Sequence, residues 1–294
     1  MNGFLIIDKQ SGISSYDVIR RLKRICSFKK IGYIGTLDRN ATGILPVVLN
    51  EAVKLIPFLE DGQKTYIATV LLGTTTDTLD IEGNVLSAIE TEPYEKPELE
   101  ELLKKFEGKI TQQIPAYSSK KVNKKPLYKW AREGIPVEPS YKEVEIYRIR
   151  LLRYIHPHLT IEVSCSKGTY IRTLAQDFGA ALGCGATLYS LKRTKHGEFT
   201  ESMCVNLDNI NARQDLLNSL ISLENVLKYL KMTTVESSLE KFLRQGMPVP
   251  LTGNPKEWIN GELTRLFDHK GILIGIGTAN ILSKTIKIKR LINS

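Results

Sequence analysis

The 294-residue chain is poor in cysteine and histidine, with four of each. No Cys-x-x-Cys spacing occurs and no histidine lies at a metal-ligand interval, so neither a zinc site nor a disulfide framework is expected, and the thiols should be reduced. The histidines match no catalytic triad. The residues concerned are Cys26, Cys165, Cys184, Cys204, His156, His158, His196 and His269.

The chain also lacks long apolar runs. The opening run Phe4 to Ile7 is interrupted by Asp8 and Lys9, which makes it too short for a signal-peptide core. No apolar stretch approaches the length needed to cross a bilayer. We therefore expect a soluble, cytoplasmic protein without a membrane partner.

Acidic residues are fewer than basic ones, 32 against 41, which leaves a formal charge of +9. This excess favours an anionic partner such as nucleic acid, although each basic cluster on its own is equally compatible with a solvated surface. The first candidate RNA-binding cluster is Arg20, Lys23, Arg24, Lys29 and Lys30. The second is Lys120, Lys121, Lys124, Lys125 and Arg132.

The apolar periodicity predicts an α+β fold with a largely antiparallel sheet, because strands and helices alternate without a regular βαβ rhythm. After about residue 233 the chain changes to short strands broken by glycine and proline, which suit a small β-barrel. We therefore predict two domains, 1–232 and 233–294. We predict strands over 4–7, 44–49, 64–72, 143–154 and 159–166, helices over 16–26, 97–106 and 170–182, a loop over 73–84 and polar helical structure over 206–230.

A single carboxylate, Asp38, lies in a loop with glycine at both ends, Gly35 and Gly43. Glycine permits backbone angles that other residues resist, and the threonines inside the loop can hydrogen-bond the turn. Taken alone, such a carboxylate is more often a turn or capping residue than a catalytic one. Other segments favour the catalytic interpretation.

Two of these segments carry an aromatic and a cationic residue. Tyr66 lies on a strand just before a polar loop, where its ring either packs in the core or stacks on an extruded base. Arg172 lies at the start of a helix, where the dipole disfavours a cation unless an anion is near. A two-point pair between Arg172 and Asp38 would satisfy both groups and orient the carboxylate.

These segments together resemble the bacterial TruB-type tRNA pseudouridine-55 synthases. The matching motifs are Gly-Thr-Leu-Asp-x-x-Ala-Thr-Gly at 35–43, Lys-Thr-Tyr with the Thr-Asp-Thr-x-Asp loop at 64–80, Gln-Ile-Pro-Ala-Tyr-Ser-Ser-Lys at 113–120, Ser-Lys-Gly-Thr-Tyr-Ile-Arg at 166–172 and Leu-Lys-Arg-Thr at 191–194. A weaker, PUA-like resemblance covers roughly 235–291.

The resemblance implies a pseudouridine-synthase catalytic domain over 1–232, with a mixed, mostly antiparallel sheet flanked by helices and an RNA-gripping insertion at about 115–139. A PUA-like RNA-binding domain follows over 233–294. It implies that Asp38 is the catalytic carboxylate. The implied substrate-binding residues are Tyr66, Arg172, Leu191, Tyr170, Lys9 and Tyr33. The expected partner is the T-arm of tRNA, bound by a monomer without a protein partner, cofactor or metal.

The chain departs from the family pattern at several positions. The family usually has Pro-Leu where this chain has Arg39 and Asn40, His in place of Tyr33, Lys-Pro in place of Lys9-Gln10, and Gly in place of Lys124. Arg39 adjoins Asp38, so it would bind phosphate or compete with Arg172. We expect these changes to affect substrate fit and rate more than reaction class.

The implied reaction breaks the C1′–N1 bond, turns the uracil and joins C1′ to C5. A carboxylate is a weak base near neutral pH, so attack at C1′ or support of a sugar cation is our first interpretation of Asp38, with abstraction of the C2′ proton as the alternative. Two other functions stay open. One is a non-catalytic RNA-binding or RNA-folding protein that keeps the cleft, and the other is a nucleoside hydrolase.

Overall fold

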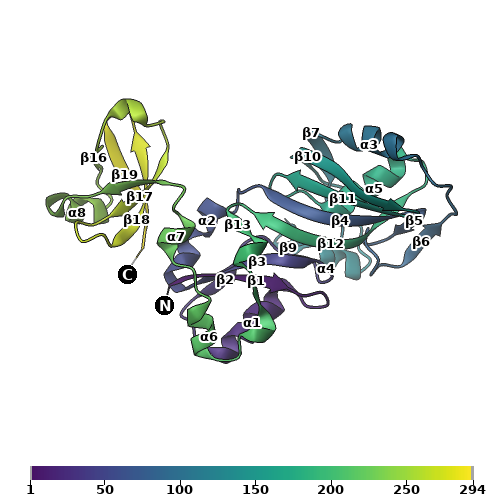
Figure 1. Cartoon of the computed structure of the whole chain (residues 1–294), viewed down its shortest axis with the longest axis horizontal. Helices are drawn as coiled ribbons and strands as arrows, with labels where there is room; N and C mark the ends of the chain where they lie inside the picture. Colours follow the sequence, from purple (N-terminus) through teal and green to yellow (C-terminus); the bar gives the residue numbers. More distant parts are fainter. Residues whose placement is uncertain (1, 293–294) are drawn as a thin grey trace.

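The computed structural model describes residues 2–292, which form an elongated molecule with a large sheet toward one end and a smaller, C-terminal sheet at the other (Figure 1). The large sheet runs in the order β14-β1-β3-β12-β4-β11-β10-β7, and β13 and β2 pair with β12 and β3. Its strands are β1 (Gly3–Lys9), β2 (Ile31–Tyr33), β3 (Thr42–Leu49), β4 (Lys64–Leu72), β7 (Gly108–Gln113), β10 (Tyr141–Ile155), β11 (His158–Cys165), β12 (Ala186–His196), β13 (Phe199–Thr200) and β14 (Val205–Asn206).

Most neighbouring strands in this sheet are antiparallel, while β1 pairs with β14 and β12 pairs with β3 in parallel. The predicted α+β class with a mixed, mostly antiparallel sheet is confirmed. The parallel pair matters for the site, because it sets Arg193 of β12 opposite Gly43 at the end of the Asp38 loop.

The sheet buries side chains on both faces. In β1, Phe4 and Ile6 belong to one apolar cluster and Leu5 and Ile7 to another, as the alternation of side chains along a strand requires. Strand β4 alternates buried and half-buried residues along its whole length, so one face of it packs in the core.

Helices pack on one face of the sheet, where their apolar side chains share a cluster with those of the strands. Helix α1 (Ser15–Ile25) buries Val18 and Leu22, and Phe178 of α5 (Ile171–Ala181) meets Phe106 edge to face with ring centroids 4.6 Å apart. The N-terminus of α1 is closed by a capping box between Ser14 and Asp17. The remaining helices are α2 (Ile56–Leu59), α3 (Lys96–Lys104), α4 (Leu127–Arg132), α6 (Arg213–Asn218), α7 (Leu223–Val226) and α8 (Ser237–Arg244).

The C-terminal sheet has five strands in the order β15-β17-β18-β19-β16, and its curled shape is compatible with a PUA-like fold. Phe267, Leu273 and Ile276 of this sheet share an apolar cluster with Phe4 and Ile6 of β1, and Leu223 and Val226 of α7 belong to the same cluster, so one apolar cluster joins the two sheets. The strands are β15 (Lys231–Thr234), β16 (Val249–Pro250), β17 (Leu263–Phe267), β18 (Leu273–Asn280) and β19 (Thr285–Leu291).

The predicted strands of the large sheet and the predicted helices that cover it are present, with ends that agree within two residues, and the structure corrects several details elsewhere. The predicted loop 73–84 contains β5 (Thr74–Thr76), which forms a hairpin with β6 (Val85–Ala88). Residues 206–230 hold short helical segments, the 3-10 turn Leu207–Asn209, α6 and α7, in place of longer helices, and the C-terminal region also contains α8. The inserted segment forms the small hairpin of β8 (Lys121–Val122) and β9 (Lys125–Pro126), followed by α4.

Within residues 2–292, no helix combines the length and the apolar character needed to cross a lipid bilayer.

Candidate functional site

A cavity of about 750 Å³ lies where the Asp38 loop, β4, β12 and the start of α5 meet. Its size is within the range of small-molecule sites, and it suits a single extruded nucleotide better than a duplex. The predicted catalytic residue Asp38 and four predicted substrate-binding residues line it: Tyr66, Tyr170, Arg172 and Leu191.

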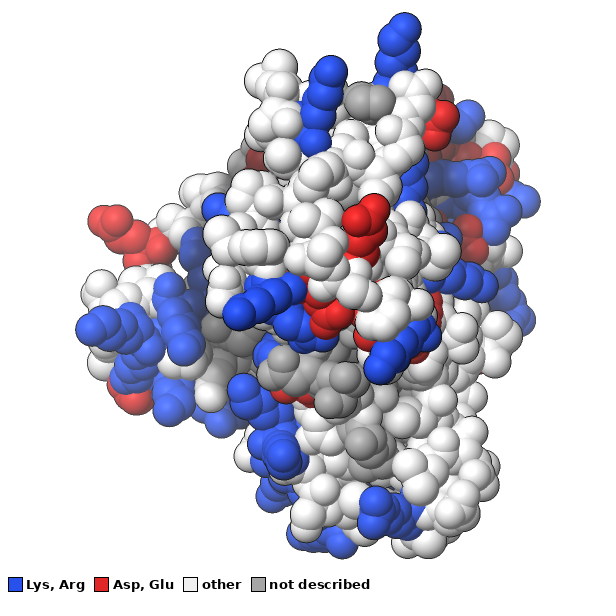
Figure 2. Space-filling model, turned by 90° about the vertical axis from the view of Figure 1, so that its left-hand side faces the viewer, with Lys and Arg blue, Asp and Glu red and all other residues white. Residues whose placement is uncertain are grey.

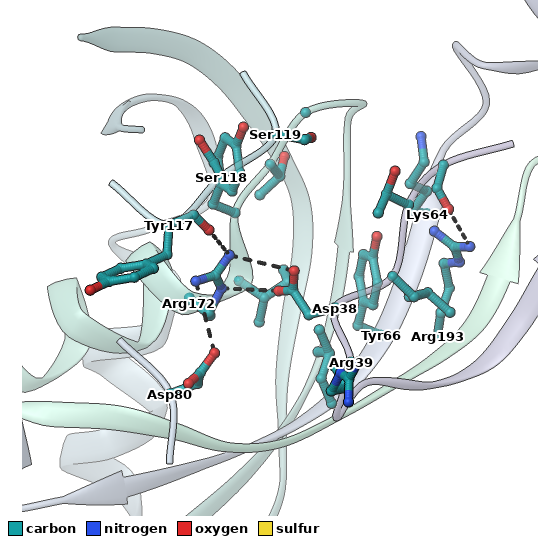
Figure 3. Close-up of a pocket in the computed structure, with 18 of the residues that line it drawn as sticks. Asp38, Arg39, Lys64, Tyr66, Asp80, Tyr117, Ser118, Ser119, Arg172 and Arg193 are labelled. Carbon is teal, nitrogen blue, oxygen red and sulfur yellow. Dashed lines mark hydrogen bonds and ion pairs between the residues drawn. The ribbon is translucent and has the colours of Figure 1, made fainter. Parts of the chain in front are cut away.

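Asp38 and Arg172 form a two-point contact inside this cavity (Figure 3). Arg172 Nε lies 3.0 Å from Asp38 Oδ2, and Arg172 Nη2 lies 3.5 Å from Asp38 Oδ1. The Arg172 side chain is only 6% exposed, whereas that of Asp38 is 48% exposed. The guanidinium is therefore a buried support, and the carboxylate keeps a free side facing the cavity.

Arg172 is itself held by two other segments of the chain. It donates to the carbonyl oxygens of Thr78 and Tyr117, each at 2.9 Å, and Nη1 lies 3.8 Å from Asp80 Oδ2. Figure 3 shows Tyr117 and Asp80 beside the guanidinium, on the side away from Tyr66. The orientation of Asp38 thus depends on the loop after β5 and on the root of the inserted segment.

The Asp38 loop is fixed at both ends by Arg193 of β12. Its Nε donates to the carbonyl of Ile44 at 2.8 Å, and its Nη2 donates to the carbonyl of Gly35 at 2.9 Å. Gly43 has a φ of +91°, and a Cβ there would lie 2.3 Å from the Arg193 carbonyl oxygen. Glycine is required at 43 both by this backbone angle and by the close approach of the two strands.

Lys9 supports the middle of the same loop. Its ammonium donates to the carbonyls of Gln10, Ile13 and Arg39 at 3.0, 2.7 and 2.9 Å, and the side chain is fully buried. Burial lowers the pKa of Lys9 to about 8.

Tyr66 forms the wall of the cavity opposite Arg172, with Asp38 between them in the close-up (Figure 3). Its side chain is nearly buried, and burial raises its pKa, while the neighbouring Arg193 charge acts in the opposite direction. Burial also raises the pKa of Tyr170. Both phenols therefore stay neutral near physiological pH, and with Leu191 they give the cavity its apolar and aromatic surfaces.

The structure shows the surroundings of three further residues that the sequence singled out. Lys9 was expected to contact substrate, but its ammonium is enclosed by backbone carbonyls, so it holds the loop instead. Tyr33 lies on β2 paired with β3, outside the residues that line the cavity. Arg39 does not compete for Asp38, because its mostly exposed guanidinium lies 4.0 Å from Asp17.

The two basic clusters lie on separate elements. Arg20, Lys23 and Arg24 are on α1, where Arg20 pairs with Asp17, and Lys29 and Lys30 follow this helix. In the inserted segment, Lys125 pairs with Glu133 and lies 4.0 Å from the centre of the Trp130 ring. Lys120 donates to Ser140 Oγ at 2.9 Å, Lys121 and Lys124 lie in the β8–β9 hairpin, and Arg132 also lines the cavity.

Positive charge is not confined to these clusters. On the face presented by the C-terminal sheet, Lys and Arg side chains are spread over most of the visible outline, with a few acidic side chains between them (Figure 2). The net charge of the chain therefore does not locate a binding surface by itself.

The sequence reasoning assigned no role to a group of buried basic residues beside the site. Lys64, Arg193 and His196 are 7%, 0% and 0% exposed. Burial lowers the pKa of Lys64 to about 8 and that of His196 to about 2, so the imidazole is neutral. A usable signal was present, because charged residues at the inward positions of strands are rare without a specific partner.

The described part of the chain contains no group of three or more His, Cys, Asp or Glu side chains arranged to hold a metal ion. The side chains that line the cavity include the half-exposed Asp38 carboxylate with its fixed cationic partner, the neutral phenols of Tyr66 and Tyr170, and the apolar Leu191.

Comparison with known proteins gives matches over most of the chain. The profile of the TruB family pseudouridylate synthase N-terminal domain matches residues 23–171, and that of the tRNA pseudouridylate synthase B C-terminal domain matches residues 172–245. A protein of Syntrophus aciditrophicus (strain SB) named tRNA pseudouridine synthase B is 42% identical over 284 residues, which cover 94% of this chain and 90% of the relative. One of the same name from Clostridium acetobutylicum is 35% identical, covering 99% of this chain and all of the relative.

Solved structures share the fold at lower identity. A chain from the structure of an H/ACA RNP bound to a substrate RNA containing 2′-deoxyuridine has a TM-score of 0.75 and 21% identity, covering 99% of this chain and 85% of that chain. A chain from an archaeal box H/ACA sRNP complex has a TM-score of 0.69, also at 21% identity, covering 98% and 85%.

Proposed function

Because the chain belongs to the TruB family of pseudouridylate synthases, we propose that it converts uridine to pseudouridine in the T loop of tRNA, at position 55. The curated relatives that it matches over nearly their full length carry the name tRNA pseudouridine synthase B. One observation supports placing the reaction in the cavity. Arg172 holds both oxygens of the Asp38 carboxylate, which is half-exposed to a cavity of nucleotide size.

Asp38 is the catalytic carboxylate in this proposal. Breaking the C1′–N1 bond builds positive character on the sugar, as in glycoside cleavage, and one ionised carboxylate close to C1′ either attacks that carbon or stabilises the charge. Removal of the C2′ proton is the alternative role. The pairing with Arg172 supports all three, since each needs an ionised and oriented carboxylate.

Tyr66 and Leu191 hold the uracil in this proposal. The departing uracil is a resonance-stabilised anion that must turn and bond again through C5, with loss of the C5 proton and gain of a proton at N1. Water would compete for C1′ during this turn. The aromatic and apolar cavity surfaces beside Asp38 support its exclusion.

The T-arm is the recognised element in this proposal, read through loop shape, phosphates and base stacking after the uridine is flipped out. The basic residues of α1 and of the inserted segment contact phosphates, and Tyr170 contacts the nucleotide in the cavity. The domain division at 232/233 stays part of the proposal, with the C-terminal sheet as an additional RNA-binding surface.

We further propose that the enzyme acts as a monomer in the cytoplasm, needs no protein partner and uses no cofactor. The chemistry supports the last point, because an isomerisation consumes no electrons and transfers no group between molecules.

The test is a single-turnover assay with a T-arm transcript carrying uridine tritiated at C5. Release of the C5 tritium together with recovered pseudouridine supports the proposal. Free uracil and an abasic site would identify a hydrolase instead. Tight RNA binding without any product would identify an RNA-binding or RNA-folding protein.

A further inference from the structure

Lys142, on β10, presents its ammonium at the mouth of the cavity, beside the Lys167–Gly168–Thr169 turn. Its Nζ donates to the Lys167 carbonyl oxygen at 3.2 Å. A Cβ on Gly168 would lie 1.8 Å from the same Nζ, so the ammonium occupies the space that a side chain at 168 would take. The lysine is thus seated over a glycine at the rim and does not extend freely into solvent.

The charges around Lys142 are of the same sign. Burial lowers the pKa of this lysine, and the neighbouring charges of Lys167 and Lys120 lower it further. The two neighbours have other partners, because Lys167 pairs with Asp61 and Lys120 donates to Ser140. Within residues 2–292, no ion pair includes Lys142.

Lys120, Lys142 and Lys167 come from three segments of the chain, and no carboxylate pairs with Lys142 at their centre. Such a group of cations indicates that an anion from outside the chain binds there. The position restricts what this anion is. Lys142 and Gly168 line the same cavity as Asp38 and Tyr66, so a nucleotide in the cavity brings its own flanking phosphate to this rim.

We propose that Lys142, with Lys167 beside it, binds a backbone phosphate next to the flipped-out uridine. This inference rests on the proposed function, because it takes the ligand to be an RNA strand entering the cavity. An ammonium is a point-charge partner for phosphate and needs no bidentate geometry. The contact would hold the strand while the base turns, and it adds Lys142 to the two basic clusters found from the sequence.

The experiment compares binding of a T-arm RNA to the wild type, Lys142→Met and Lys142→Arg by fluorescence anisotropy, over about 50 to 400 mM KCl. Removing one phosphate contact lowers the slope of log Kd against log salt by about 0.7 to 0.9, which corresponds to about five- to eightfold weaker binding at 0.1 M salt. Lys142→Arg should keep the slope. The control is Lys109→Met, which changes a lysine of the adjacent strand β7 that pairs with Glu143 and lies outside the cavity lining.

A second arm uses RNAs in which single phosphates around the target uridine are replaced by neutral methylphosphonates. Neutralising the contacted phosphate should weaken the wild type by the same factor as Lys142→Met and should have no further effect on that variant. An unchanged salt slope, or equal losses for both proteins at every phosphate, overturns the assignment while leaving the proposed function standing. Absence of T-arm binding by the wild type would overturn both, whereas a Lys142-dependent slope without pseudouridine would refute only the proposed function. Thermal melting of each variant confirms that it is folded.

Discussion

The substitution Arg172→Lys separates the charge of the Asp38 partner from its geometry. The guanidinium reaches Asp38, the Thr78 carbonyl and the Tyr117 carbonyl at once, from three nitrogens. Lysine keeps one positive charge but has a single nitrogen, so it cannot serve all three. The carboxylate would stay paired in some orientation, while the segments that now fix that orientation would lose a common partner.

The expected loss of stability follows from these contacts. At least one buried carbonyl loses its donor, at a cost of about 1–3 kcal/mol. The ion pair between Asp38 and Arg172 contributes about 0–1 kcal/mol, the usual contribution of a pair at the surface, because Asp38 is 48% exposed. A total of about 1–4 kcal/mol would lower the melting temperature by roughly 2–7 °C and leave the protein folded.

The expected loss of activity is larger than the loss of stability suggests. A misplacement of about 1 Å at a reacting group lowers the rate about 100-fold. We predict a loss of this size for Arg172→Lys in single-turnover tritium release at saturating enzyme. Affinity for the T-arm RNA should change by less than about threefold, because Asp38 is not a phosphate partner. The control is Arg150→Lys, which alters an exposed arginine paired with Glu162 on β11. An Arg172→Lys rate within about threefold of the wild type would refute the orienting role.

Three further substitutions test the support of the site. Because Lys9 has a pKa of about 8 when folded and 10.5 as its ordinary value, the unfolded chain holds more protons between these values. The free energy of unfolding should therefore rise with pH above about 8. Urea titrations at pH 8 and 9 measure this slope, and Lys9→Met should reduce it by up to about 1.4 kcal/mol per pH unit. An unchanged slope would contradict a buried lysine with a lowered pKa. Gly43→Ala should cost about 2–4 kcal/mol in thermal melts, against about 1–2 for Gly12→Ala, whose φ is +84° but whose Cβ would meet nothing within 4 Å. Equal losses would show that the close approach to Arg193 is unimportant. Tyr66→Leu should slow single-turnover isomerisation about 10- to 100-fold, the value of one base stack, and a wild-type rate would exclude stacking on the uracil.

The elements that position the site were predictable where local patterns are strong. Strand β4 alternates inward and outward residues, and α1 carries an apolar stripe, so both were found from the sequence. The β5–β6 hairpin was missed because its threonines and acidic residues match a polar loop. Helix α8 was missed because short strands and glycines dominate its surroundings.

The pairing of Asp38 with Arg172 was predictable from charge, since a cation at a helix start needs an anion. What the sequence could not reveal are contacts with backbone carbonyls. Lys9 and Arg193 both act through carbonyl oxygens far away in the chain, at Arg39, Gly35 and Ile44, and no residue type marks such acceptors. Lys9 was therefore expected at the substrate and lies instead beneath the loop.

We propose that the Asp38 carboxylate performs the isomerisation in the cavity that it shares with Tyr66. The most direct test is Asp38→Asn, which keeps the shape of the side chain and removes the charge. The measurement is single-turnover pseudouridine formation in a T-arm RNA, with Asp208→Asn, a surface carboxylate paired with Arg21, as the control. We predict no pseudouridine from Asp38→Asn and RNA affinity within about threefold of the wild type. Pseudouridine formation by this variant at the rate of the control would contradict the account.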